Sequence, residues 1–449
     1  MAPLLNIVVV GGSLGGLFNG IALSRRGHRV TILERNPTPL MHDQGAGIVA
    51  GTDVQKFFDR YDRTHSSLAV TSHARQYLNR TGEVIHREKR AQQMTSWDLL
   101  YHLLRANFDG IETSYTHSPP RHSTDGPVEY RYGRKVTSIA DLGANNGVRI
   151  TSEDTTTTTT TENQSTNSET TTADILIAAD GASSTTRTLL HPSSPPRRTY
   201  AGYIAWRGTC PEHLLSPSTR TALAESFTFH HAPGTQILGY LIPGPSGTLA
   251  PGRRLLNWVW YVNYAEASDE LRDIMTDADG KTHHLTLPPG GVREEVWAGV
   301  KERARRELPP AFAEAVERTE APFVQAVTDV LAERAGWWGG KVVLTGDALA
   351  GFRPHTAAST SQAAFDAEQT AALVDGEIGL EEWEKRVMKY AREVQKKGVE
   401  LGDRIEALGQ VLIMLFGDAR RSDAVKRRGY CKFNDTVETC VTYGLYPEG

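Results

Sequence analysis

The chain has 449 residues, of which 39% are hydrophobic and 23% are charged, and its formal net charge is −4. This balance is typical of a soluble globular protein and gives no reason to expect nucleic acid or an anionic membrane as a partner. No apolar run is long enough to span a bilayer. Cys210, Cys431 and Cys440 lack metal-site spacing, so we expect reduced thiols and a cytoplasmic location.

The first predicted element is a strand over residues 5–10, an apolar run of the kind buried on both faces of a parallel sheet. A glycine-rich turn at residues 11–16 follows, then a helix over residues 17–26 and a second strand over residues 29–33. That strand ends on Glu34. Such a turn approaches a pyrophosphate, and such an acid accepts hydrogen bonds from ribose hydroxyls, so the segment predicts an ADP-binding site.

The region after Glu34 departs from a nicotinamide-binding domain, in which another helix and strand would follow at once. Residues 44–49 are instead glycine-rich and can lie along a flat ring. Helices are expected over residues 53–61 and 96–108, and strands over residues 128–139 and 147–151. The threonine-rich residues 155–172 are interpreted as an expanded hairpin loop that leads to a strand over residues 174–179.

A second acid at a strand tip is Asp180, which is followed by Gly181, small hydroxyl residues and Arg187. From residue 200 to residue 264 the pattern predicts a second, mostly antiparallel sheet. Its strands are expected over residues 203–207, 226–231, 236–242 and 255–264. Alternation along the first of them places Tyr203 and Arg207 on one face and Trp206 on the other.

A third acid is Asp347, after a strand over residues 341–344. A helix is expected before it, over residues 292–306, and residues 322–330 lead back to this strand. After Pro354 we expect a helix that begins near residues 355–356, has small residues in its first turn and stops at residues 375–376. A first turn without bulk lets a ligand lie against free backbone N–H groups at the positive end of the helix. The helical region over residues 380–416 is interpreted as a packing or dimer helix.

Three acid-tipped strands, ending at Glu34, Asp180 and Asp347, point to one long ligand with a polyol between its ends, which describes FAD. At this point the sequence resembles the single-component FAD-dependent aromatic hydroxylases of the p-hydroxybenzoate hydroxylase fold, over roughly residues 5–376. Residues 203–208 (YIAWRG) and 353–358 (RPHTAA), with the GGSLGG turn, resemble the 2,6-dihydroxypyridine 3-monooxygenase subgroup. Ser359, where glycine is usual, and Ser96, where many relatives have arginine, depart from the wider family.

The resemblance implies an α/β fold in which a Rossmann-like FAD-binding domain is interleaved with an antiparallel-sheet substrate domain. Residues 1–190 and 321–376 would form the FAD-binding domain, residues 191–320 the substrate domain and residues 377–449 a C-terminal helical region. It also implies NADPH or NADH as a transient reductant, O₂ as co-substrate and hydroxylation of a small aromatic or heteroaromatic ring through a flavin hydroperoxide. A hydroxylated pyridine and a natural-product intermediate are both open as substrates, and a homodimer is possible.

The candidate residues follow from these motifs. The catalytic candidates are His355, Tyr203 and Arg207. Two of them have a structural alternative: a helix-start residue for His355 and an edge ion pair for Arg207. The cofactor-binding candidates are Gly11, Ser13, Leu14, Gly16, Glu34, Arg35, Gly47, Ile48, Val136, Asp180, Gly181, Asp347, Pro354, Thr356, Ala357 and Ala358.

Other functions were weighed against hydroxylation. No metal site is expected, because neighbouring histidines such as His230 and His231 face opposite ways on a strand. A flavin-dependent halogenase would share the fold, and Trp258-Val259-Trp260 resembles its Trp-x-Trp element, although the Ile-Pro that should follow is absent. An FAD protein that does not hydroxylate is the other alternative.

Overall fold

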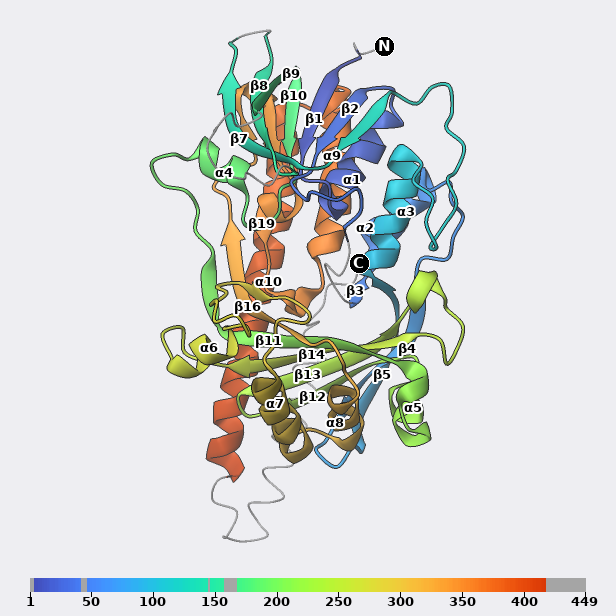
Figure 1. The fold of residues 1–449 in the computed structure, drawn as a ribbon, viewed down its shortest axis with the longest axis vertical. Helices are drawn as coiled ribbons and strands as arrows, with labels where there is room; N and C mark the ends of the chain where they lie inside the picture. Colours follow the sequence, from blue (N-terminus) through green and yellow to red (C-terminus); the bar gives the residue numbers. More distant parts are fainter. Residues whose placement is uncertain (1–3, 42–46, 144–145, 157–167, 417–449) are drawn as a thin grey trace.

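A computed structural model describes residues 4–41, 47–143, 146–156 and 168–416, with side chains described only as far as residue 403. Two sheets dominate it, one above the other in Figure 1. No helix in the part of the chain that the structure describes is long and apolar enough to cross a membrane. Cys431 and Cys440 lie outside the described residues, whereas Cys210 is a buried free thiol.

The upper sheet has six strands in the order β17-β18-β10-β1-β2-β6. Its centre is β1 (Asn6–Val10), which pairs in parallel with β2 (Arg29–Leu33) and β10 (Ile175–Ala178). The other strands are β6 (Val128–Arg131), β17 (Gly336–Trp337) and β18 (Val342–Leu344). All pairs are parallel except β17 with β18. The carboxyl ends of the parallel strands therefore meet at one edge of the sheet, as we predicted from the acids at the strand ends.

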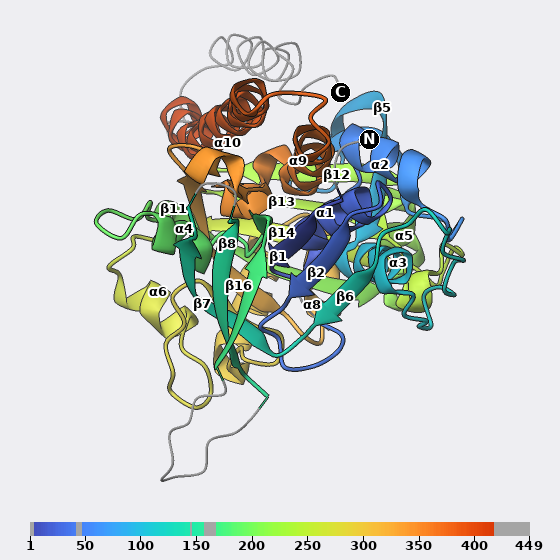
Figure 2. The same cartoon turned by 90° about the horizontal axis from the view of Figure 1, so that it is seen from above.

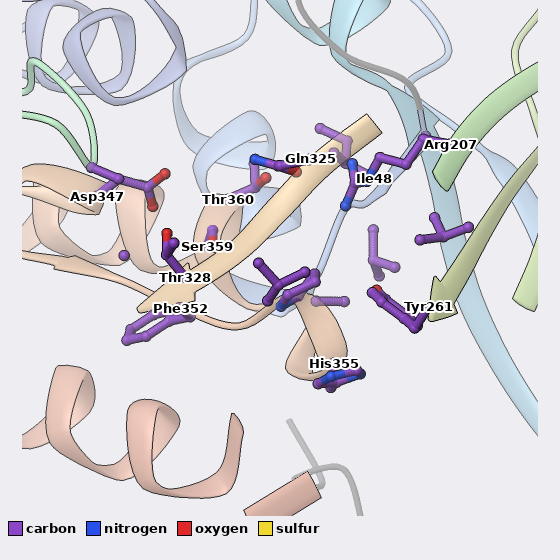
Figure 3. Close-up of a pocket in the computed structure, with 18 of the residues that line it drawn as sticks. Ile48, Arg207, Tyr261, Gln325, Thr328, Asp347, Phe352, His355, Ser359 and Thr360 are labelled. Atoms are coloured by element: carbon purple, nitrogen blue, oxygen red, sulfur yellow. The ribbon is translucent and has the colours of Figure 1, made fainter. Parts of the chain in front are cut away.

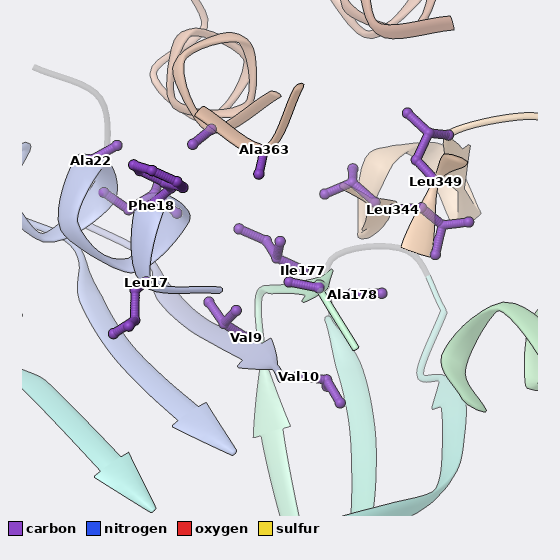
Figure 4. Packing of buried hydrophobic residues seen from close by; sticks show 14 of the residues in the cluster. Val9, Val10, Leu17, Phe18, Ala22, Ile177, Ala178, Leu344, Leu349 and Ala363 are labelled. Carbon is purple, nitrogen blue, oxygen red and sulfur yellow. The ribbon is translucent and has the colours of Figure 1, made fainter. Parts of the chain in front are cut away.

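Helices cover this sheet and bury its apolar strands. They are α1 (Leu14–Ser24), α2 (Thr52–Tyr61), α3 (Trp97–Asp109) and α9 (Ser359–Val374). Figure 4 shows Val9 and Ile177 of the strands to the right of Leu17 and Phe18 of α1 and below Ala363 of α9, and all five belong to one buried cluster. Small residues on α9 allow close packing on α1, and Asn19 of α1 donates a hydrogen bond to the hydroxyl of Thr345, just after β18, at 3.2 Å.

The lower sheet is larger and mostly antiparallel, in the order β15-β16-β11-β14-β13-β12-β4-β5-β3, with β19 paired to β16. The strands are β3 (Gly47–Val49), β4 (Val70–Leu78), β5 (Val84–Ser96), β11 (Thr199–Pro211), β12 (Ser226–Ala232), β13 (Thr235–Ile242), β14 (Leu255–Asn263), β15 (Thr286–Leu287), β16 (Phe323–Leu331) and β19 (Ala350–Gly351). Strands β3, β4 and β5 come from the first hundred residues, so the two sheets interleave along the chain.

Helices α5 (Pro217–Leu223), α6 (Asp269–Ile274), α7 (Glu294–Glu307) and α8 (Pro310–Glu317) belong to the lower half of the molecule. In Figure 1, α7 and α8 lie under the sheet, on the side away from β1. Strand alternation is as predicted: Ile204 and Trp206 pack in the cluster that includes α7 and α8 residues, whereas Tyr203 and Ala205 pack in a separate cluster on the opposite face.

The last helix, α10 (Leu380–Phe416), packs on α9 and on the turn that carries His355. Figure 2 shows its first part beside α9. Trp383, Val387 and Ala391 are fully buried against the upper core, which gives the helix a packing role in the described part of the chain. The possible dimer role predicted for this helix stays a prediction, and its side chains beyond residue 403 lie outside the described ones.

Three local predictions were wrong. The helix expected near residues 355–356 begins at Ser359, because Pro354–Thr356 forms a 3-10 turn (η5) and Ala357 takes a left-handed conformation (φ 52°). The strand expected over residues 128–139 is two strands in different sheets, β6 and β7 (Arg134–Asp141), separated by a left-handed Gly133.

The third concerns the threonine-rich stretch. Its last residues form β9 (Ser168–Ala173), which pairs with β8 (Val148–Asp154) and β7 in a three-stranded sheet. The hairpin is therefore β8–β9 and not a pairing of β8 with the strand that ends at Ala178. Residues 157–167 lie outside the described part of the chain.

Candidate active site

The glycine turn after β1 is compact because its glycines leave no room for a side chain. Gly11 has φ +98°, and a Cβ there would lie 2.4 Å from the carbonyl oxygen of Ala179. A Cβ on Gly16 would lie 1.8 Å from the carbonyl oxygen of Gly11. Helix α1 begins at Leu14, and the side chain of Ser13 at its N-cap makes no capping hydrogen bond. The first N–H groups of the helix are therefore available to an anion.

A cavity of about 570 Å³ opens beside this turn, and we call it the turn cavity. Glu34 lies on its wall, where its carboxylate accepts hydrogen bonds from the backbone N–H of Gly12 at 2.6 Å and of Asn36 at 2.8 Å. Seven predicted cofactor residues line it: Gly11, Ser13, Glu34, Arg35, Val136, Asp180 and Gly181. Leu14 and Gly16 shape the turn but are not on this wall. Trp97 and Met41 also line it, and the sequence reasoning missed both.

The segment after β10 connects the turn cavity to the loop after β18. The carboxylate of Asp180 accepts hydrogen bonds from the backbone N–H of Thr186 at 2.9 Å and from the Ser184 hydroxyl, at the start of α4 (Thr185–Leu190). Arg187 then donates to the carbonyl oxygen of Ala348 at 2.8 Å. Asp180 therefore helps to hold the segment after β10 against the loop after β18, in addition to lining the turn cavity.

Asp347, by contrast, has a carboxyl group that no other described residue hydrogen-bonds. Burial raises the pKa of this carboxyl to about 6, although the positive charges of Arg198 and Arg187 act to lower it. A carboxylate that is half-buried and without a donor is poised to accept hydrogen bonds from ligand hydroxyls.

Asp347 lies at one end of a second cavity of about 270 Å³, which we call the central cavity (Figure 3). The predicted residues Gly47, Ile48, Arg207, Asp347, Pro354, His355 and Ala357 line it, as does Ser359. Thr356 and Ala358 are next to the wall but not on it. Residues that sequence reasoning missed include Arg198, Tyr240, Tyr261, Gln325 and Phe352. The central cavity lies between the upper sheet and the inner face of the lower sheet.

His355 and Tyr203 form a pair at one side of this cavity. The Tyr203 hydroxyl lies 2.7 Å from Nε2 of His355, and the Tyr261 ring lies 4.7 Å from the imidazole ring, centroid to centroid. Burial, together with the nearby charge of Arg353, lowers the pKa of His355 to about 3, so its imidazole is neutral at physiological pH. Tyr203 supports His355 from behind and is not on the wall. His355 is therefore no helix-start residue: the N-cap position of α9 is Ala358.

Arg207 has no ion pair with any described residue, and its buried Nε has no hydrogen-bond partner. Within the described part of the chain, the edge ion pair that was its structural alternative does not form. Its side chain reaches the central cavity from β11, on the side where Ile48 and Tyr261 lie (Figure 3). An arginine is always charged, so the cavity wall carries an uncompensated positive charge.

The two cavities together fit FAD. The turn cavity offers free helix N–H groups and an acid for an ADP moiety, Asp347 offers an unpaired acceptor for a polyol, and the central cavity accepts a flat ring. Ser96, where relatives of the wider family have arginine, serves as N-cap of α3 and accepts from the Leu99 N–H at 3.1 Å.

Comparisons with known proteins agree with this geometry. Residues 200–329 match a family described as FAD binding domain-like. The chain is 28% identical over 414 residues to 2,6-dihydroxypyridine 3-monooxygenase of Paenarthrobacter nicotinovorans, covering 89% of this chain and 91% of that protein. The chain is an FAD-dependent monooxygenase. It resembles the 2,6-dihydroxypyridine 3-monooxygenase subgroup and uses FAD with NADPH or NADH as reductant.

Solved structures show the same fold for this monooxygenase. The structure of 2,6-dihydroxypyridine-3-hydroxylase from Arthrobacter nicotinovorans has a TM-score of 0.75 at 24% identity and covers 90% of this chain and 94% of its own. Klebsiella pneumoniae HpxO, complexed with FAD and uric acid, has a TM-score of 0.64 at 18% identity, with coverage of 90% and 92%.

The halogenase alternative finds no support. None of these proteins is named a halogenase, and the Trp-x-Trp element faces away from the central cavity. Trp258 and Trp260 are fully buried with the residues of α7 and α8, where their indole N–H groups donate to Thr319 and Thr235. The residues between and after them, Val259 and Tyr261, are those that line the cavity.

Proposed function

We propose that this monooxygenase hydroxylates a small heteroaromatic ring that carries an ionised hydroxyl group, such as a hydroxypyridine, bound in the central cavity. The observation that carries the proposal is the unpaired guanidinium of Arg207 on the cavity wall. A phenolate-type oxygen is the natural partner for this cation, because a charge-assisted hydrogen bond would satisfy both groups. An ionised hydroxyl also makes the ring electron-rich.

Bound FAD supplies the oxidising chemistry, with electrons from NADPH or NADH and oxygen from O₂. The chain's own residues have to bind the ring, hold its oxyanion and keep water away. The central cavity is suited to this, since Phe352, Val259 and Leu238 give it apolar walls and Arg207 places a cation beside Ile48 and Tyr261. The name of the relative, which specifies a dihydroxypyridine, supports a heteroaromatic substrate for this chain.

We propose that His355 orients the substrate ring and does not accept the proton of the substrate hydroxyl. A pKa of about 3 makes its imidazole a weak base, so the charge of an ionised substrate has to be balanced by Arg207 instead. The neutral imidazole can still hold a hydrogen bond to a ring nitrogen or hydroxyl. The Tyr203 hydroxyl, 2.7 Å from Nε2, fixes the ring orientation of His355.

The test is a substrate screen combined with an Arg207 variant. Rates of NADPH oxidation by the FAD-loaded protein are measured with hydroxypyridines, phenols and indoles, and substrate affinity is measured by perturbation of the flavin absorbance. Arg207→Gln should lower the affinity for a hydroxypyridine by about ten- to hundredfold, the loss expected for one charge-assisted hydrogen bond. Arg207→Lys should recover part of it.

Matched ligands give the control. The same ring without its hydroxyl should bind wild type and Arg207→Gln alike, since it offers no oxyanion. Equal affinity of both proteins for the ionised hydroxypyridine would remove Arg207 from the substrate site. A rate increase with indoles alone would replace the proposed substrate class.

Three further expectations stay predictions: the division into an FAD-binding domain over residues 1–190 and 321–376 with a substrate domain over residues 191–320, a cytoplasmic location and a possible homodimer. Sedimentation of the FAD-loaded protein would test the last of these.

A further inference from the structure

A third cavity, of about 570 Å³, lies beside the central cavity, and we call it the side cavity. Three residues line both: Arg198, Ala326 and Thr328. They come from β16 and from the segment just before β11. The outer wall of the side cavity is formed by α6 and by residues 282–285. The two cavities are therefore separated by a shared wall of a few side chains.

Arg198 stands in this shared wall and is held only by neutral groups. Its Nε and Nη2 donate to the Thr328 hydroxyl at 2.9 and 2.6 Å, and its Nη1 donates to the Ser183 hydroxyl at 2.9 Å. The Asp347 carboxylate lies near enough to attract its charge but forms no ion pair with it. The charge of Arg198 is therefore only partly balanced, and its guanidinium can still hold a phosphate by charge-assisted hydrogen bonds.

The outer wall adds further cationic and apolar groups. Arg272, paired with Asp269, and His284 line it, and Glu266 is the acid on the same wall. The apolar and aromatic members are Tyr200, Leu271, Met275 and Leu285. A ligand with phosphates and flat rings fits this lining better than a small neutral ring does.

We propose that the side cavity binds NADPH or NADH, with the pyrophosphate beside Arg198 and the adenosine half along the wall of Arg272 and His284. The nicotinamide end then passes the shared wall into the central cavity. There a hydride, two electrons with one proton, leaves the nicotinamide ring for FAD, and NADP⁺ or NAD⁺ departs. The inference rests on the FAD-dependent activity, which already requires this reductant, and adds where the reductant binds.

The test uses the FAD-loaded protein and a double variant of the outer wall, Arg272→Glu with His284→Glu. Anaerobic flavin reduction is followed at increasing NADPH and, separately, NADH, and NADP⁺ binding is measured by titration calorimetry. The double variant should raise the half-saturating nucleotide concentration and the NADP⁺ dissociation constant by about tenfold, through lost attraction and added repulsion. FAD content and affinity for the aromatic substrate should not change.

A matched control carries the same charge change elsewhere. Arg305, exposed and paired with Glu317, and His117, exposed near Glu112, both lie outside the side cavity, so Arg305→Glu with His117→Glu should behave as wild type. Nucleotide affinities within twofold of this control would overturn the proposal. So would a loss of aromatic-substrate affinity in its place, which would make the side cavity a substrate entrance. An FAD-loaded wild type that neither nucleotide reduces would contradict the activity itself.

Discussion

Replacing Asp347 by asparagine should stabilise the FAD-free protein and at the same time weaken FAD binding. In the FAD-free protein the Asp347 carboxyl is half-buried and accepts no hydrogen bond from another described residue, and burial raises its pKa from 3.8 to about 6. The folded protein therefore binds this proton more tightly than the unfolded chain does. The corresponding stabilisation is complete below about pH 4 and is lost as the pH rises through about 6.

The size of the effect follows from the shift. About two pKa units correspond to about 3 kcal/mol at neutral pH, and because water still reaches the half-buried carboxyl we expect about 1–3 kcal/mol. Asp347→Asn removes this penalty above pH 6 and should have little effect near pH 4. FAD affinity should fall by about ten- to hundredfold, because a charge-assisted hydrogen bond from a polyol hydroxyl is lost.

Two measurements on one preparation test this: urea unfolding of the FAD-free protein between pH 4 and 8, and FAD titration by fluorescence quenching. Asp125→Asn is the control. Burial acts to raise the pKa of Asp125, but hydrogen bonds from Arg63 and the charge of Arg25 hold it well below its usual range. Asp125→Asn should therefore lower stability at neutral pH and leave FAD affinity unchanged. The reasoning fails if Asp347→Asn destabilises the FAD-free protein at pH 8, or if FAD binds it as tightly as wild type.

Three more outcomes are expected. The purified protein should be yellow and hold one non-covalent FAD per chain, and binding of FMN alone would contradict the role of Glu34, since FMN lacks the adenosine ribose. His355→Ala should keep FAD bound and reducible but lower product formation by about 10²-fold, the loss expected for a misplaced ring, with the electrons recovered as hydrogen peroxide; unchanged coupling would leave His355 with a packing role alone. Tyr203→Phe, which keeps the ring and removes the hydroxyl near Nε2, should lower coupling less than His355→Ala; equal losses would mean that the hydroxyl acts on the substrate directly.

The parts of the site that sequence could predict depend on local patterns. Apolar runs that end in Glu34, Asp180 or Asp347 are visible in the chain, and parallel pairing brings those ends to one edge. The glycine turn is also local, because Gly11 and Gly16 have no space for a Cβ. These features were enough to predict the strands that end in these acids, the cofactor and several residues of the turn cavity.

The missed parts depend on contacts between distant segments. Helix α9 begins only at Ser359 because Ala357 takes a left-handed conformation. An alanine in the sequence gives no sign of that conformation. Arg198 matters because Thr328 and Ser183, from two other segments, hold it between two cavities. The chain before residue 100 contributes β3, β4 and β5 to the lower sheet through pairing with β12, and no single segment shows that partnership.

The most direct test of the account is a balance of oxygen, reductant and product. The FAD-loaded protein is supplied with NADPH and a hydroxypyridine, and O₂ consumed, NADPH oxidised, hydroxylated product and hydrogen peroxide are measured together. We predict that the hydroxypyridine accelerates NADPH oxidation and that product accounts for most of the oxygen consumed. Oxygen that is recovered entirely as peroxide with every ring tested would contradict hydroxylation as the function of this site.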